Sequence, residues 1–126
     1  MAYSISNPAG RVVASILEEL PSLIAVAVVD LESGLALASH TNVPSFDPEA
    51  AAAYNTEVVK QKRKAMQALR LTDEKIDDIL ITLRRQLHII KLNQAGTKFL
   101  YLSVNPRDTN LAIAREVLRA HSGDIN

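Results

Sequence analysis

The chain has 126 residues, of which 48% are hydrophobic and 22% charged, as in an ordinary globular protein. Its 14 basic and 14 acidic residues cancel, which argues against a protein that binds nucleic acid or anionic lipid through its overall charge. The absence of cysteine excludes disulfides, thiolate metal sites and cysteine nucleophiles. We expect one domain over residues 1–126, with a core of about residues 8–121.

No stretch of the sequence is typical of a targeting or membrane segment. Residues 1–10 are polar and lack a basic region that leads into an apolar one. The longest apolar run, residues 23–29, is too short to cross a bilayer. The sequence therefore predicts a cytoplasmic protein without membrane insertion.

The first part of the chain predicts a helix followed by a hairpin. Apolar residues recur at helical spacing over residues 8–20, and Pro21 ends that helix. Residues 23–29 are continuously apolar and rich in β-branched side chains, which is typical of a strand covered on both faces. Residues 30–34 form a turn that ends in glycine, and residues 35–39 return as a partner strand.

A long helix is predicted over residues 47–70, because Asp47 can cap a helix that Pro48 begins. At about 100° per residue, its apolar side chains fall on two adjacent seams. The first seam comprises Ala51, Tyr54, Val58, Ala65 and Leu69, and the second comprises Ala52, Val59 and Met66.

Two apolar seams are more than a surface helix of a small domain normally buries. If both seams packed on the sheet, they would simply be core. Burial of each large apolar side chain contributes about 1.5–3 kcal/mol of stabilisation. A seam left in water would therefore forgo several kcal/mol and form an exposed apolar patch that promotes association. We favour a helix that packs on its own domain through one seam and on a partner through the other.

The rest of the chain predicts three strands and a last helix. Residues 76–83 and 86–92 follow a polar linker and flank a tight turn at Arg84-Arg85, and residues 98–104 follow a second turn. Asn105-Pro106 is expected to open the last helix. Its buried side is predicted to comprise Leu111, Ala114, Val117, Leu118 and His121. The polar tail, residues 122–126, is expected to fray.

This order of elements predicts an α/β protein in the broad sense, of the α+β class. Three consecutive strands with short turns must form an antiparallel meander. We expect a five-stranded antiparallel sheet between the long helix and the two terminal helices.

Two segments resemble the Roadblock family, which contains dynein light chains and bacterial regulators of Ras-like GTPases. The first is the hairpin of residues 23–30 and 33–39, an apolar strand followed by an acidic turn with glycine and a strand that ends in small residues. The second is the run Asn110-Leu111-Ala112-Ile113-Ala114-Arg115, which is similar to the family's last helix. The resemblance covers roughly residues 12–120.

The resemblance implies a profilin-like fold with strand order 2-1-5-4-3. It also implies a dimer in which the long helices pack together and residues 76–83 pair with the same strand of the twin. Bacterial members typically bind a small GTPase on the paired helices, as activators or scaffolds, generally without donating a catalytic residue. On this basis the expected interface comprises Ala51, Tyr54, Asn55, Val58, Val59, Lys62, Met66, Leu69, Ile79 and Ile81.

Two groups of basic residues could guide an acidic partner. Lys60, Arg63 and Lys64 surround the apolar strip on the long helix, or they form an ordinary solvated face. Arg84 and Arg85 could reach a bound nucleotide as an arginine finger, but we favour a polar turn that discourages aggregation of the sheet edge.

The sequence offers no arrangement typical of an active site. His40, His88 and His121 are not at metal-ligand spacing, and the neighbouring carboxylates diverge rather than face each other. The four glycines do not form the glycine-rich pattern of a phosphate-binding or a dinucleotide-binding loop. We therefore expect no enzyme activity and no cofactor.

The leading hypothesis is a non-enzymatic homodimer that binds and regulates a Ras-like small GTPase. The first alternative is a scaffold subunit that heterodimerises with a related Roadblock protein and leaves GTP hydrolysis unchanged. The second alternative is a small-ligand sensor or enzyme on a profilin-like fold, which would need a polar-lined cavity.

Overall fold

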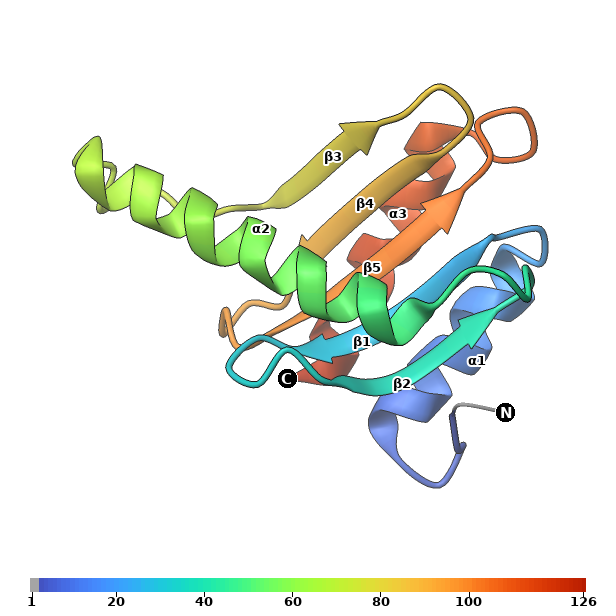
Figure 1. Cartoon of the computed structure of the whole chain (residues 1–126). Helices are drawn as coiled ribbons and strands as arrows, with labels where there is room; N and C mark the ends of the chain where they lie inside the picture. The colour runs from blue at the N-terminus through green and yellow to red at the C-terminus, as the bar shows by residue number, and fades with distance from the viewer. Residues whose placement is uncertain (1–2) are drawn as a thin grey trace.

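The structure is a computed structural model that describes residues 3–126. One sheet separates helix α2 on its front face from helices α1 and α3 on its back (Figure 1). The elements in chain order are α1 (Pro8–Glu19), β1 (Ala25–Asp30), β2 (Ala36–Thr41), α2 (Pro48–Ala68), β3 (Asp78–Thr82), β4 (Leu87–Leu92), β5 (Lys98–Val104), α3 (Leu111–His121) and the 3-10 helix η1 (Ser122–Ile125).

The sheet has the strand order β2-β1-β5-β4-β3, and every neighbouring pair is antiparallel. This order confirms the α+β class and the topology expected from the sequence. Strands β1 and β5 lie at the centre, where both faces are covered, and their side chains are almost all buried. Strand β3 forms one edge of the sheet and pairs only with β4.

Each face of the sheet carries its own core, because side chains alternate along a strand. On the back face, Val13 and Ile16 of α1 and Leu118 of α3 belong to one buried cluster with alternate residues of β1, β4 and β5. On the front face, Ala52 and Val59 of α2 belong to a second cluster with the other residues of the same strands. The layered architecture thus follows from the period-two pattern of the central strands.

The start of α2 confirms the predicted cap. One carboxylate oxygen of Asp47 accepts hydrogen bonds from the backbone N–H of Glu49 at 2.9 Å and of Ala50 at 3.2 Å. Pro48 occupies the first helical turn, where no backbone donor is needed. The helix therefore has a fixed start, which sets which side chains face the sheet.

The start of the last helix differs from the prediction. Helix α3 begins at Leu111, and the Asn110 side chain caps it by accepting from the N–H of Ala112 at 2.8 Å and of Ile113 at 3.4 Å. The Asn105 carbonyl instead accepts from the N–H of Asp108 and Thr109, which closes a separate turn. Asn105 and Asn110 are both residues that can cap the start of a helix, and the local sequence does not show which of them does so.

The C-terminal tail is ordered rather than frayed, which corrects the expectation. Residues Ser122–Ile125 form a 3-10 helix, and the Ile125 side chain is 3% exposed in the back-face core. His121 Nε2 also lies 2.6 Å from the Glu19 carboxylate of α1. One apolar side chain at the end of a polar tail is enough to dock it.

Among the helices of residues 3–126, none combines the length and the apolar character needed to cross a bilayer.

Asn93 fixes the β4–β5 turn from a buried position, 4% exposed. Its Oδ1 accepts from the N–H of Thr97 at 2.9 Å and of Lys98 at 3.1 Å. We predict that Asn93→Ala lowers the free energy of unfolding by about 1–3 kcal/mol, because it strands two backbone donors. Urea unfolding followed by circular dichroism measures the loss.

The matched control is Gln94→Ala, at an exposed position of the same turn. It should change the free energy of unfolding by less than about 0.5 kcal/mol. Equal losses in the two variants would contradict a structural role for the Asn93 amide.

Candidate interaction surface

The two apolar seams of α2 have opposite environments. In the second seam, Ala52 and Val59 are fully buried against the sheet and Met66 is half-buried. In the first seam, Tyr54 is 77% exposed and Leu69 is 66% exposed. The helix therefore buries one stripe within its own domain and presents a second to the outside.

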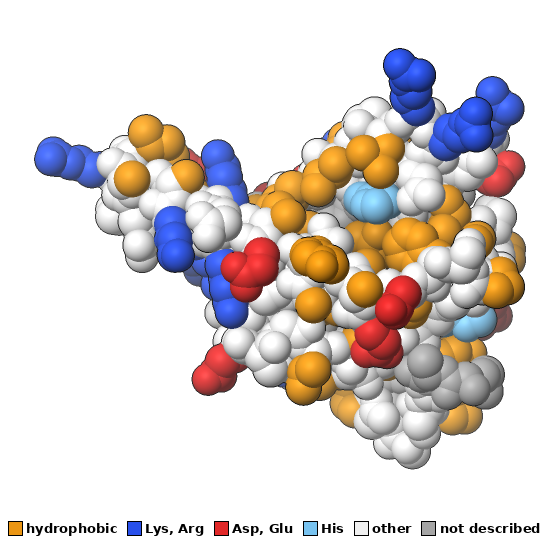
Figure 2. Space-filling model, in the orientation of Figure 1, with side chains coloured by type: hydrophobic (Ala, Val, Ile, Leu, Met, Phe, Trp, Pro, Cys, Tyr) orange, Lys and Arg blue, Asp and Glu red, His pale blue; other side chains and the backbone are white. Residues whose placement is uncertain are grey.

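We call Ala51, Tyr54, Val58, Ala65 and Leu69 the exposed seam. Four of these five side chains are exposed, and Ala51 is half-buried. Helix α2 makes its main sheet contacts with β1 and β2, and its C-terminal part extends beyond the sheet (Figure 1). Figure 2 shows apolar side chains at the end of this projecting part, with Lys and Arg side chains beside them. Within residues 3–126, the domain leaves Tyr54, Val58 and Leu69 of this strip exposed.

An apolar groove continues the exposed seam toward β3. The groove has a volume of about 550 Å³ and lies between α2 and β3. Its apolar wall is formed by Val58, Met66, Leu71, Ile76 and Ile79. Charged side chains at its border are Lys62, Glu74, Lys75 and Asp78. Val58 belongs to both the groove and the exposed seam, so the two form one continuous surface.

The outer edge of β3 has backbone groups that no other strand in residues 3–126 uses. The N–H of Leu83 donates to the Gln86 carbonyl at 2.9 Å, just beyond the paired strands β3 and β4. Because antiparallel strands alternate between inward- and outward-facing residues, Ile79 and Ile81 also direct their backbone groups to β4. Asp78, Leu80 and Thr82 then direct theirs to the free edge. This edge is a template for a further strand.

The structure corrects two of the residues expected at the interface. Val59 is 0% exposed, and Asn55 is 9% exposed with its amide donating to the Ala51 carbonyl at 2.8 Å. Both lie on the sheet-facing side of α2, so they support the fold rather than a contact. The other expected residues lie on or beside the free surface, and their contact with a partner stays a prediction: Ala51, Tyr54, Val58, Lys62, Met66, Leu69, Ile79 and Ile81.

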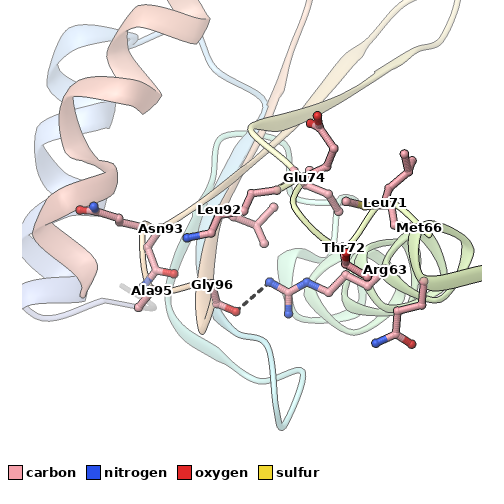
Figure 3. A pocket seen from close by; sticks show the side chains of 13 residues that line it. Arg63, Met66, Leu71, Thr72, Glu74, Leu92, Asn93, Ala95 and Gly96 are labelled. Atoms are coloured by element: carbon pink, nitrogen blue, oxygen red, sulfur yellow. Dashed lines mark hydrogen bonds between the residues drawn. The ribbon is translucent and has the colours of Figure 1, made fainter. Parts of the chain in front are cut away.

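Two basic residues of α2 hold the helix to its own domain. Arg63 Nη2 donates to the Gly96 carbonyl at 2.9 Å across a pocket of about 350 Å³ (Figure 3). Lys60 Nζ lies 3.4 Å from the Glu32 carbonyl. Lys64 is exposed on the far side of the helix from the sheet. The basic residues therefore do not act as one collar, and Arg63 in particular supports the projecting half of α2.

Arg84 and Arg85 lie at the end of the sheet away from the projecting end of α2 (Figure 1). Both are exposed in the β3–β4 turn, and with Arg107 they line a hollow of about 280 Å³. They are therefore separated from the basic residues of α2. Any role in binding a partner must be considered apart from the exposed seam.

A half-buried polar cluster beside β3 is one feature that the sequence did not reveal. His88 Nε2 lies 2.7 Å from Gln86 Oε1, and its Nδ1 lies 3.2 Å from the Tyr101 hydroxyl. Because the amide oxygen can only accept, Nε2 carries the proton and Nδ1 accepts from the hydroxyl. Ser103 donates to the same Gln86 oxygen at 3.1 Å, and the Phe46 ring lies edge-on to His88. The alternation of apolar and polar residues along β4 predicts a partly buried His88, but not its contacts with Gln86 and Tyr101.

Burial sets the titration of this cluster. It lowers the pKa of His88 below its usual value of 6.5 and raises the pKa of Tyr101. The neutral imidazole is thus the form that the folded protein prefers. His88 lies opposite Ile81 in the β3–β4 register, next to the free edge of the sheet.

We predict that His88 makes the protein less stable in mild acid. Because its folded pKa is below 6.5, its contribution is complete above about pH 6.5 and is lost as the pH falls through the folded pKa. Between about pH 7.5 and pH 5, the wild type should lose more free energy of unfolding than His88→Gln, which has no titrating group here. Urea unfolding at both pH values measures this, and an NMR titration that places the His88 pKa at or above 6.5 would contradict it.

Solved structures share this architecture at low sequence identity. Myxococcus xanthus MglB has a TM-score of 0.76 at 15% identity, over 97% of this chain and 94% of that chain. A Roadblock/LC7 domain from Streptomyces avermitilis has a TM-score of 0.74 at 15% identity, over 91% and 92% of the two chains. A structure described as MglB with tetrameric arrangement has a TM-score of 0.75 at 16% identity, over 98% and 91%.

Comparison of the sequence itself gave no match to a family model and none to a curated protein. The likeness to solved structures therefore concerns the fold, over nearly the whole length of both partners in each comparison. It agrees with the strand order and the layers of helices described above. This chain has the Roadblock/LC7 fold.

Proposed function

We propose that the chain is a non-enzymatic module that forms a homodimer and, as a dimer, binds and regulates a Ras-like small GTPase. One observation carries this proposal: the exposed seam, the apolar groove and the free edge of β3 form one continuous surface on one side of the domain. A surface of this kind is costly to leave in water, since each large apolar side chain contributes about 1.5–3 kcal/mol when it is buried.

A second copy of the chain fits this surface. Its β3 would extend the sheet at the free edge, and its α2 would cover the groove that contains Val58 and Ile79. The Roadblock resemblance supports the same arrangement. A structural neighbour described in a tetrameric arrangement supports self-association of this fold in general.

The paired helices would then offer a platform for a GTPase. Bacterial members of the Roadblock family typically bind small GTPases there. The dimer would act by contacting one arrangement of the GTPase switch regions better than the others, which shifts their populations. It would donate no reacting group, in keeping with a sequence that offers no phosphate loop and no paired catalytic side chains.

The second candidate is a scaffold subunit. The same apolar surface could accept a related Roadblock protein, and the resulting heterodimer could hold a GTPase or another assembly without changing hydrolysis. Partner selection and GTP turnover separate the two functions.

Val58 lies at the junction of the seam and the groove, so we predict that Val58→Asp disrupts the dimer. An unpaired carboxylate in an apolar contact should weaken self-association about a hundredfold or more. Light scattering coupled to gel filtration measures the mass. The matched control is Ala53→Asp, exposed on α2 about 140° away from Val58 around the helix. A wild type that is monomeric at high micromolar concentration would overturn the proposed dimer.

We also predict that the wild type binds a Ras-like GTPase from the same genome and changes its rate of GTP hydrolysis. Single-turnover hydrolysis with and without the chain measures the change, and the Val58→Asp variant should have no effect because it lacks the paired helices. Binding with unchanged turnover would favour the scaffold. A dimer that binds none of these GTPases would contradict regulation of a GTPase.

A further inference from the structure

The two ends of β3 carry opposite charge. Four of the six residues in 73–78 are acidic and one is basic, and this segment leads into the strand. Arg84 and Arg85 follow the strand in the exposed β3–β4 turn. Arg107 lies in the same hollow as these two arginines, and Lys and Arg side chains gather at this corner of the molecule (Figure 2). The free edge is therefore a short strand with an acidic start and a basic end.

Several of these charges have no partner within the domain. Asp77 forms an ion pair with Lys91, and Asp78 forms one with Arg115. No salt bridge within residues 3–126 uses Asp73, Glu74, Arg84, Arg85 or Arg107. The unpaired charges are thus the outermost ones on both sides of the strand.

Symmetry restricts how two β3 strands can pair. A two-fold axis perpendicular to the sheet keeps each side chain on its own face, so one residue must lie opposite its own copy. Leu80 is the middle of Asp78–Thr82, and its backbone groups are directed outward. With Leu80 on the axis, Asp78 lies opposite Thr82 of the second copy, and the outward backbone groups of all three residues find partners.

The same register brings the charged ends together. Because opposing residue numbers add to a constant in an antiparallel pair, Asp77 lies opposite Leu83 of the second copy. Beyond this pair neither segment is a strand, and Lys75 is the one basic residue of the acidic segment. The Arg84-Arg85 turn then lies beside the acidic segment, and the two-fold axis repeats this contact at the other end. A shift of the axis by one residue to Ile81 would still bring Asp77 and Asp78 opposite the arginines.

We propose that the opposite charges at the two ends of β3 select a second copy of this chain as the partner of the free edge. This inference rests on the proposed dimer and adds the reason that the chain prefers itself to a related protein. A related fold with other charges at these positions would lack the complementarity, and a like-charged one would be repelled. An unrelated acidic ligand could use the arginines, but it would leave the acidic segment without a role.

Charge reversal tests the proposal. One variant carries Arg84→Glu and Arg85→Glu, and the other carries Asp73→Lys and Glu74→Lys. In the homodimer of either variant, like charges lie side by side at both symmetric ends of the β3 pair. The dissociation constant of that homodimer should therefore be about tenfold higher or more than that of the wild type. An equimolar mixture of the two variants restores opposite charges at both contacts and should form a heterodimer of nearly wild-type affinity.

Sedimentation equilibrium with one variant fluorescently labelled measures all three dissociation constants. The matched control carries Glu18→Lys and Glu32→Lys, which change the net charge as Asp73→Lys and Glu74→Lys do, but at exposed sites far from β3 in the sequence. The control should dimerise like the wild type. Recovery in the mixture also shows that both variants are folded.

The outcomes separate this inference from the proposed dimer. A monomeric wild type would overturn the dimer itself. A dimer whose affinity is unchanged by either reversal would overturn the charge-based selection and leave the dimer standing. Two weakened variants that fail to recover when mixed would also overturn the selection, since the loss would then not come from charge pairing between the ends.

Discussion

Helix α2 touches the sheet along a single stripe, and the rest of the structure depends on this contact. Ala52 and Val59 are buried in the front-face cluster with residues of β1, β4 and β5, and the Asp47 cap fixes where the helix begins. The helix crosses the sheet rather than following β3, and Arg63 ties its far half to the β4–β5 turn. That geometry leaves a second apolar stripe and the groove beside β3 open on one side.

The open side of the domain carries several features that contribute nothing to the stability of an isolated domain. The exposed seam meets the groove at Val58, and the groove leads through Ile76 and Ile79 to the unpaired edge of β3, whose two ends carry opposite charge. Natural sheets normally blunt such an edge with charge, a bulge or a covering loop. Here charge is placed at the ends of the strand, and the middle, around Leu80, is left able to pair.

The sequence predicted the layers and strand order because period-two and period-3.6 patterns report which faces are apolar. It placed the start of the last helix wrongly at Asn105-Pro106 instead of at Asn110, since both asparagines offer the same capping chemistry. It also missed the docked tail, where a single side chain, Ile125, outweighs a polar surrounding. The contacts of His88 depend on residues far apart in the chain, such as Phe46 and Tyr101, which no local pattern joins.

The docked tail has a practical consequence. Ile125 and the contact between His121 and Glu19 fasten the end of the chain to α1, on the face of the sheet opposite α2. A fluorophore or affinity handle attached after Asn126 would thus leave from the back of the molecule. Surface immobilisation through Asn126 would turn helix α2 and its exposed seam toward the solution.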